Sequence, residues 1–190
     1  MAGKVEVICG SMFSGKTTEL HRRVRRAAIA GKRFIVVKPR MDTRTAEHLQ
    51  THDGSQLKAE NVANSVELLK MVEAMDPRPH IIAIDEAQFF DGGIVDAVNG
   101  MATKYGMKVI LAGLDMDRHG RTFGPMGDLL ATADDVTKLK AVCAHTNQEG
   151  RVCGRKAYVS RLLVEDDNAP VKIGASDIYS ARCRAHSTNK

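Results

Sequence analysis

The residues best suited to chemistry form one run near the N-terminus: Gly10, Ser11, Met12, Phe13, Ser14, Gly15, Lys16 and Thr17. This run fits the phosphate-binding loop pattern G-x-x-x-x-G-K-[ST] at every fixed position. The glycines of such a loop let successive backbone N–H groups point at one anion. The lysine reaches the outer phosphates, and the hydroxyl after it is a ligand of Mg²⁺. The pattern predicts a nucleoside triphosphate site, with a chance glycine-rich turn as the alternative.

Two neighbouring carboxylates, Asp85 and Glu86, form a second candidate site directly after the apolar run 80–84. An apolar strand that ends in acidic residues suits a phosphate-loop fold, because ligands gather at the carboxyl edge of the sheet. We expect Asp85 to hold Mg²⁺, directly or through water, and Glu86 to face the reacting centre as a base. A merely structural acidic pair is the alternative.

Cysteine and histidine near the C-terminus indicate a metal site. Cys183 and His186 form a C-x-x-H pair, and Cys143 and Cys153 precede them. Two such knuckles that bridge a small sheet make a structural zinc ribbon. The segment between Cys143 and Cys153 is longer than the usual two to four residues, so unrelated buried thiols are the alternative.

The elements that must position these residues alternate between strand and helix. Apolar runs predict strands at residues 5–9, 33–38, 59–63, 80–84, 108–114 and 136–141. Periodic segments predict helices at residues 17–30, 65–75, 93–105 and 127–133, the second of them capped by Ser65. This alternation predicts the α/β class, with a parallel sheet flanked by helices. The polar stretch 40–58 is expected to be a long loop, and the glycine-containing stretch 115–125 a lid.

Composition limits the class of protein. A chain of 190 residues suits one ordinary domain with a small appendage, and we expect domains at 1–141 and 142–190. No apolar run is long enough to span a bilayer and the start lacks the apolar core of a signal peptide, so we predict a cytoplasmic protein without a membrane partner. The net charge of +5 permits a nucleic-acid partner, but a solvated helix face explains it better.

Six motifs together resemble the zinc-containing thymidine kinase family of bacteria, phages and animals. They occur in the family's order and cover nearly the whole chain: GSMFSGKTTEL at 10–20, DTR at 42–44, DEAQFF at 85–90, GLDMD at 113–117, KLKAVC at 138–143 and IGxxDxYxxxCRxH at 173–186.

The resemblance implies a P-loop domain and a small zinc-binding domain, usually assembled as a homotetramer. Such enzymes transfer the γ-phosphate of ATP to the 5′-hydroxyl of thymidine, and the end product dTTP often inhibits them. Glu86 matches the family's catalytic base. The family's ATP-binding positions match the phosphate loop, residues 10–17, and Asp85, Glu86, Ala87 and Gln88. Residues that match positions around the nucleoside and its phosphate are Met12, Arg44, Phe89, Leu114, Phe123, Gly174 and Tyr179. The matching zinc ligands are Cys143, Cys153, Cys183 and His186.

Three departures from the family pattern leave alternatives open. Arg118 stands where the lid usually carries phenylalanine. This difference predicts a changed affinity for the nucleoside or a changed preference among nucleosides, with deoxyuridine as the nearest other substrate. The insertion 144–152 separates cysteines that the family spaces as C-x-x-C, and it brings His145 in as a rival fourth ligand. Val159 stands near the place of a family threonine. The alternative function is a nucleic-acid-dependent ATPase, which ordinarily needs a second ATPase lobe.

Overall fold

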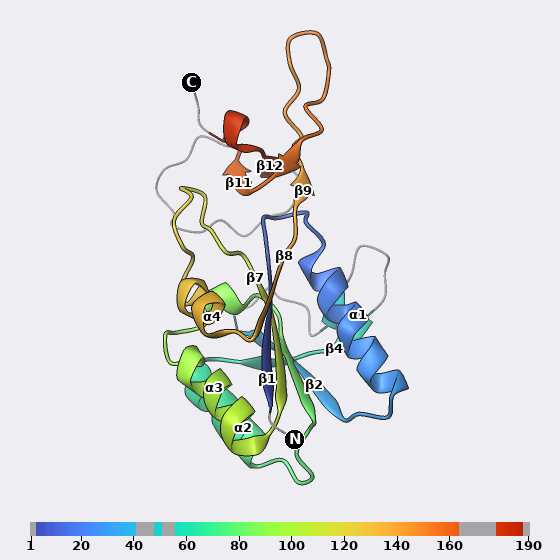
Figure 1. Cartoon of the computed structure of the whole chain (residues 1–190), viewed down its shortest axis with the longest axis vertical. Helices are drawn as coiled ribbons and strands as arrows, with labels where there is room; N and C mark the ends of the chain where they lie inside the picture. The colour runs from blue at the N-terminus through green and yellow to red at the C-terminus, as the bar shows by residue number, and fades with distance from the viewer. Residues whose placement is uncertain (1–2, 41–47, 51–55, 164–177, 188–190) are drawn as a thin grey trace.

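The computed structural model describes residues 3–40, 48–50, 56–163 and 178–187, and it confirms the predicted α/β class. Its centre is a sheet of six parallel strands (Figure 1). These are β1 (Lys4–Cys9), β2 (Phe34–Pro39), β5 (Glu60–Val62), β6 (Ile81–Ile84), β7 (Lys108–Gly113) and β8 (Asp135–Lys138). The strand order is β5-β2-β6-β7-β1-β8, so the strand that leads into the phosphate loop lies between β7 and β8.

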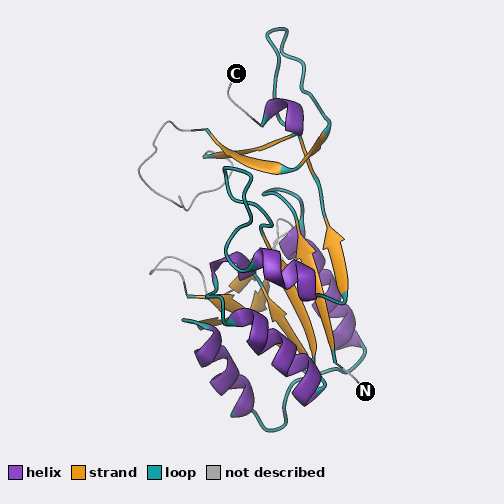
Figure 2. Cartoon of the chain, turned by 60° about the vertical axis from the view of Figure 1, so that its left-hand side comes forward, coloured by secondary structure: helices purple, strands orange, loops and turns teal. Residues whose placement is uncertain are grey.

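Helices cover both faces of the sheet. One face carries α1 (Lys16–Ile29), and the other carries α2 (Ser65–Glu73), α3 (Ile94–Tyr105) and α4 (Met126–Thr132), as Figures 1 and 2 show. Successive residues of β1 point to opposite faces, because side chains alternate along a strand. Ile8 therefore packs in the apolar cluster with Leu20 of α1, whereas Val7 packs in the cluster with Met101 of α3. The two clusters therefore pack the helices against the two faces of the sheet.

The cap of α2 differs from the prediction. Asn64, not Ser65, caps this helix, because its extended backbone lets the side-chain oxygen accept a hydrogen bond from the Glu67 N–H at 2.9 Å. Ser65 is already helical, and its hydroxyl donates to Asp91 at 2.6 Å. The capping position is therefore one residue earlier than the sequence suggested.

Two segments depart from the predicted elements. Within the stretch expected to be a loop, β3 (His48–Gln50) and β4 (Gln56–Lys58) pair as antiparallel strands. The strand expected at 136–141 is divided into β8 and β9 (Ala141–Val142). The break falls at Leu139, whose N–H donates to the carbonyl of Cys9 at 2.8 Å and so ties the end of β8 to the start of the phosphate loop.

A small module stands beyond the carboxyl end of the sheet. It consists of β9, β10 (Lys156–Ala157), β11 (Val159–Leu162), β12 (Tyr179–Arg182) and the 3₁₀ turn η2 (Arg184–His186). β9 pairs with β10 and β11 with β12, both antiparallel. A hairpin between β9 and β10 projects from the far end of this module (Figure 1). The domain boundary at 142 stays a prediction.

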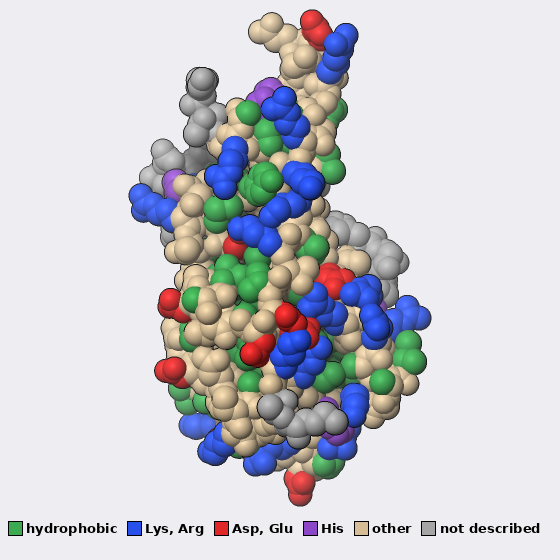
Figure 3. Space-filling model, in the orientation of Figure 1, with side chains coloured by type: hydrophobic (Ala, Val, Ile, Leu, Met, Phe, Trp, Pro, Cys, Tyr) green, Lys and Arg blue, Asp and Glu red, His purple; other side chains and the backbone are tan. Residues whose placement is uncertain are grey.

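Two of the arginines of α1, Arg22 and Arg23, form ion pairs with carboxylates of the fold. Arg23 contacts Glu19 and Glu6, both at 2.9 Å, and Arg22 contacts Glu19 at 2.6 Å. Figure 3 shows acidic and basic side chains interspersed on this face. The basic residues of α1 are therefore partly neutralised by neighbours, which favours a solvated helix face over a surface for nucleic acid.

Among the residues that the structure describes, no helix has the length and apolar character that crossing a membrane requires.

Candidate active site and metal cluster

The phosphate loop begins where buried β1 ends. Gly10 has φ 142°, and a Cβ atom there would lie 2.4 Å from the carbonyl oxygen of Leu139, so only glycine fits. Gly15, with φ 85°, leads directly into α1, whose first N–H groups therefore face the loop. The hydroxyls of Ser11 and Ser14 are buried without a hydrogen-bond partner in the described structure. A loop of this shape, with free hydroxyls inside it, suits a bound anion.

Lys16 and Thr17 stand at the start of α1 and face the end of β6. The Lys16 ammonium donates to the carbonyl of Ser11 at 3.0 Å. Burial lowers the pKa of Lys16, while the charges of Glu86 and Asp85 oppose this effect. The Thr17 hydroxyl lies 3.2 Å and 3.4 Å from the two carboxylate oxygens of Asp85. The structure thus brings together the two residues that the sequence assigned to Mg²⁺.

Asp85 is the more buried of the two carboxylates, with 3% of its surface exposed. Burial, and then the charge of Glu86, raise its pKa to about 7. A hydroxyl and a carboxylate are oxygen ligands of the kind that Mg²⁺ takes in proteins. These two residues fit such an ion, which would also relieve the repulsion between the carboxylates.

Glu86 occupies an unusual backbone conformation. Its φ of 55° lies in the left-handed region, which costs a residue other than glycine on the order of 1–3 kcal/mol. The 3₁₀ turn η1 (Ala87–Phe89) follows at once, and Phe89 N–H donates to the Glu86 carbonyl at 3.1 Å. The Glu86 carboxylate accepts a hydrogen bond from the Gln88 side chain at 2.5 Å. Strain of this kind clusters at functional positions, and here it holds the backbone of the expected base in one conformation.

Aromatic and apolar residues gather beside this turn. Phe89 packs edge-on against Phe123, with ring centroids 5.4 Å apart. Phe123 belongs to the predicted lid, and its N–H donates to the carbonyl of Asp115 at 3.3 Å. Leu114, half-buried, stands at the end of β7, where its N–H donates to Gln88. Three of the residues expected around the nucleoside therefore lie on neighbouring segments.

The segment predicted to be a lid folds into a closed turn. Met116 and Thr122 form a bridge across it, and the Asp117 carboxylate accepts hydrogen bonds from the N–H groups of His119 and Arg121 at 2.8 and 2.9 Å. Arg118 donates to the ring of His119 at 3.0 Å. The Arg118 guanidinium is therefore engaged within the lid itself.

The C-terminal module reaches the phosphate loop through Ser160 of β11. Its hydroxyl accepts a hydrogen bond from the Met12 N–H at 2.8 Å, across 148 positions of sequence. Tyr179 begins β12 and lies opposite Leu162 of β11. Sequence reasoning missed Ser160, because one serine in a short strand has no spacing signal. Arg44 and Gly174, two further expected substrate residues, fall outside the described residues.

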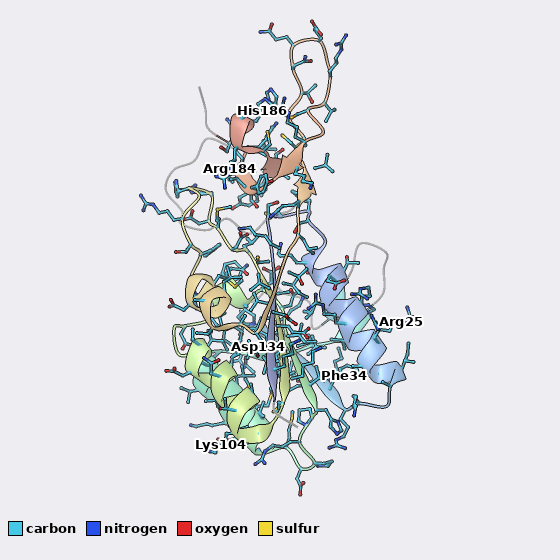
Figure 4. All side chains as sticks on the ribbon, viewed as in Figure 1. Arg25, Phe34, Lys104, Asp134, Arg184 and His186 are labelled. Carbon is cyan, nitrogen blue, oxygen red and sulfur yellow. The ribbon has the colours of Figure 1, made fainter. Side chains whose placement is uncertain are left out.

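The four predicted zinc ligands meet in the C-terminal module. The ligand atoms of Cys143, Cys153, Cys183 and His186 all lie within 4.8 Å of one another. The His186 Nδ1 atom is 3.4 Å from the Cys183 sulfur and 3.6 Å from the Cys143 sulfur. Figure 4 shows His186 beside Arg184 at this end of the molecule. Three thiols and one imidazole are the ligands of a structural zinc site.

Electrostatics at Cys143 favour metal binding. Burial acts to raise the pKa of its thiol, but hydrogen bonds from the backbone N–H groups of Cys183 and His145, together with the His186 side chain, overcome that effect and lower the pKa to about 6. The thiolate, which is the form that binds metals, is therefore well populated at neutral pH.

His145 lies beside the cluster and is not one of its four members. Its ring stacks on the ring of His186, with centroids 3.9 Å apart. The long insertion closes on itself at its base, where Cys153 N–H donates to the His145 carbonyl at 2.7 Å and Gly154 N–H to the Cys143 carbonyl at 3.2 Å. Cys143 and Cys153 are thus brought together despite their separation, and the geometry favours Cys143 over His145 as a ligand.

Comparison with known proteins agrees with this arrangement. A family model described as thymidine kinase matches residues 3–187. The chain is 45% identical over 183 residues to a thymidine kinase of Rhodothermus sp. (strain ITI 518), which covers 96% of the chain and 80% of that relative. It is 42% identical to thymidine kinases of two Bacteroides fragilis strains, which covers 96% of the chain and 85% of each relative. The chain belongs to the thymidine kinase family.

Proposed function

We propose that this protein transfers the γ-phosphate of ATP to the 5′-hydroxyl of thymidine and so makes thymidine monophosphate. The observation that carries the proposal is the meeting of three groups at one edge of the sheet. The phosphate loop, the Thr17–Asp85 pair and the Glu86 carboxylate lie at the carboxyl ends of β1 and β6, the two strands on either side of β7, in a chain that belongs to the thymidine kinase family. Nothing in the comparisons favours the alternative of a nucleic-acid-dependent ATPase.

In the proposed reaction, the phosphate loop holds the triphosphate through its N–H groups, with Lys16 at the outer phosphates. Thr17 and Asp85 would hold Mg²⁺, which when bound neutralises charge on the phosphate oxygens. Glu86 accepts the proton of the 5′-hydroxyl as that oxygen forms a bond to the γ-phosphorus. The bond from phosphorus to the β–γ bridging oxygen breaks, and ADP leaves with that electron pair. A sugar hydroxyl is a weak nucleophile, so this proton transfer is the step that needs a side chain.

The nucleoside is proposed to lie against Met12, Phe89, Leu114, Phe123 and Tyr179. The edge-to-face pair of Phe89 and Phe123 offers an apolar wall for a thymine ring and its methyl group. Arg44 and Gly174, which lie outside the described residues, are assigned to the same site by the family resemblance alone. Backbone groups satisfy the imide edge of the base, so no further charge is needed there.

The cluster of Cys143, Cys153, Cys183 and His186 is proposed to hold a structural Zn²⁺. Four further proposals rest on membership in the family: ATP contacts at residues 85–88, a homotetrameric assembly, inhibition by dTTP and a cytoplasmic location.

The deciding experiment supplies purified protein with Mg²⁺ and ATP, and with thymidine, deoxyuridine, deoxycytidine or single-stranded DNA as the second component. Separation of the products by chromatography should give thymidine monophosphate in amounts that match the ADP formed. The rate with deoxyuridine relative to thymidine measures how strongly the site uses the 5-methyl group. ATP turnover that only DNA stimulates would overturn the proposal and support the alternative.

A further inference from the structure

The Gln88 side chain connects the expected base to the root of the lid. Its Nε2 atom donates to a carboxylate oxygen of Glu86 at 2.5 Å, and its Oε1 atom accepts from the backbone N–H of Leu114 at 3.0 Å. An ionised carboxylate can only accept and a backbone N–H can only donate, so these two partners fix the orientation of the amide. Both ends of Gln88 are therefore in use.

Close packing also holds Gln88 in place. Only 2% of its surface is exposed. A Cβ atom at Gly113 would lie 2.8 Å from the Gln88 Oε1 atom, and one at Gly124 would lie 2.2 Å from the Gln88 carbonyl oxygen. Glycine at these two positions leaves room for the residue between the end of β7 and the end of the lid. The side chain has little freedom to turn toward another partner.

We infer that Gln88 is a positioning residue that holds the Glu86 carboxylate for proton transfer, and that it is not an ATP contact through its side chain. The inference rests on the proposed role of Glu86 as the base. The family resemblance placed Gln88 among the ATP-binding residues, but its amide is already committed to Glu86 and Leu114. Ala87, beside it, is fully buried as well.

Glu86 needs such a partner because its backbone alone does not determine where the carboxylate points. The residue is held in the left-handed region, but its side chain still has rotatable bonds. A hydrogen bond from a rigid, buried amide removes that freedom before substrate arrives. Fixing a reacting group in advance lowers the barrier without any change in how tightly substrates bind.

The same contacts tie the base to the lid. Leu114 immediately precedes the lid and Gly124 lies near its end, so Gln88 touches both of its roots. The next residue, Phe89, packs against Phe123 inside the lid. A shift of the lid would therefore move the amide that holds Glu86.

Two substitutions separate these contacts. Gln88→Met keeps the length of the side chain and loses both hydrogen bonds. Gln88→Glu keeps an acceptor for Leu114 N–H but replaces the donor to Glu86 by a second carboxylate. We expect each to lower kcat by about 10- to 100-fold, the value of a hydrogen bond to a charged group. The KM for ATP should change less than about threefold, since no ATP contact is lost. The matched control is Gln148→Glu in the exposed hairpin, which should leave both constants unchanged.

A double-mutant cycle with Glu86→Gln shows whether Gln88 acts through Glu86. If it does, Gln88→Met should add less than about twofold to the loss caused by Glu86→Gln, because the partner it positions is already gone. A merely structural role would multiply the two losses. Thermal unfolding of every variant shows which are folded, and Gln88→Glu, which preserves volume, serves if Gln88→Met is not.

Three outcomes are distinguishable. A large rise in the KM for ATP with kcat retained would overturn the inference and restore Gln88 as an ATP contact. Losses that multiply in the cycle would overturn it as well. Nearly normal turnover of Glu86→Gln would instead overturn the proposed base, and with it the premise of the inference.

Discussion

The Thr17 hydroxyl and the Asp85 carboxylate lie 3.2 Å apart, although 68 positions separate the two residues in the sequence. One stands in the first turn of α1 and the other directly after β6. The parallel sheet brings them together, because the strand that leads to the phosphate loop and the strand that leads to Asp85 end at the same edge.

Removing the Asp85 charge should weaken Mg²⁺ binding. For Asp85→Asn we expect at least a roughly tenfold rise in the Mg²⁺ concentration that gives half-maximal activity, since a carboxylate ligand is lost. The measurement is the rate at fixed ATP over a series of free Mg²⁺ concentrations. Thr17→Ser, which keeps the hydroxyl, should behave like the parent protein.

The same dependence should change with pH. Burial raises the pKa of Asp85 to about 7, so its carboxyl is protonated below that pH and a proton competes with the metal. The Mg²⁺ requirement of the parent protein should therefore fall as the pH rises through about 7. Asp85→Asn has no such proton to lose, and a requirement that changed equally in both proteins would contradict this assignment.

Substitution of Glu86 should separate activity from stability. Glu86→Gln should lower kcat by about 10²- to 10⁴-fold while ATP still binds, because a general base contributes that much. Glu86→Gly and Glu86→Ala should be equally inactive, but the glycine variant should be the more stable of the two by about 1 kcal/mol. Both lose the acceptor of the Gln88 amide, and only glycine adopts the left-handed backbone without strain. Rates and urea unfolding of the three variants test these expectations. A Glu86→Gly protein no more stable than Glu86→Ala would show that the positive φ is not strained.

The metal cluster makes a prediction about composition. Purified protein should contain about one zinc per chain, and Cys183→Ser should lose it. His145→Ala should retain the metal, because its ring stacks on His186 and is not one of the four grouped ligands. Elemental analysis of these three proteins and of Cys143→Ser measures this directly. Loss of zinc from His145→Ala with retention in Cys143→Ser would reverse the choice between the two residues.

Glu19 should stabilise the fold in a pH-dependent way. Hydrogen bonds from Arg22 and Arg23 lower the pKa of Glu19 from 4.5 to about 2, although burial acts to raise it. Its contribution to the free energy of unfolding is therefore complete above pH 4.5 and is lost as the pH falls toward 2. Glu19→Gln should cost on the order of 1 kcal/mol at pH 7 and less at pH 3, as measured by urea unfolding.

Short sequence patterns predicted those parts of the site whose structure depends only on neighbouring residues. The phosphate loop is fixed by glycines and by the change from strand to helix around Gly10 and Lys16, all within one short segment. The acidic pair after β6 could be placed for the same reason. Ser160 could not, because its role depends on which backbone N–H lies above β11 in the folded chain. Asn64 and Ser65 are both good caps, and only the starting residue of α2 decides between them.

The sequence left unrelated buried thiols as an alternative to the metal cluster, because the usual rule counts the residues between two cysteines. A metal ion requires only that the two sulfur atoms lie close together in space. Cys143 and Cys153 need to lie at the two ends of a hairpin base, and two backbone hydrogen bonds meet that need here. The chain between them can lengthen outward without moving either sulfur. A search that fixes the number of residues between two ligands therefore misses sites whose knuckle carries such an extension.

The hydrogen bond between Met12 and Ser160 bears on how such enzymes diversify. The phosphate loop contributes the N–H, but the hydroxyl belongs to a module encoded at the other end of the gene. Recombination that exchanged only the C-terminal module between two relatives would give Met12 a new neighbour and leave Lys16, Asp85 and Glu86 untouched. Selection on the contacts that this module makes to the phosphate loop could therefore proceed while the residues proposed for phosphate transfer were inherited unchanged from the other half of the chain.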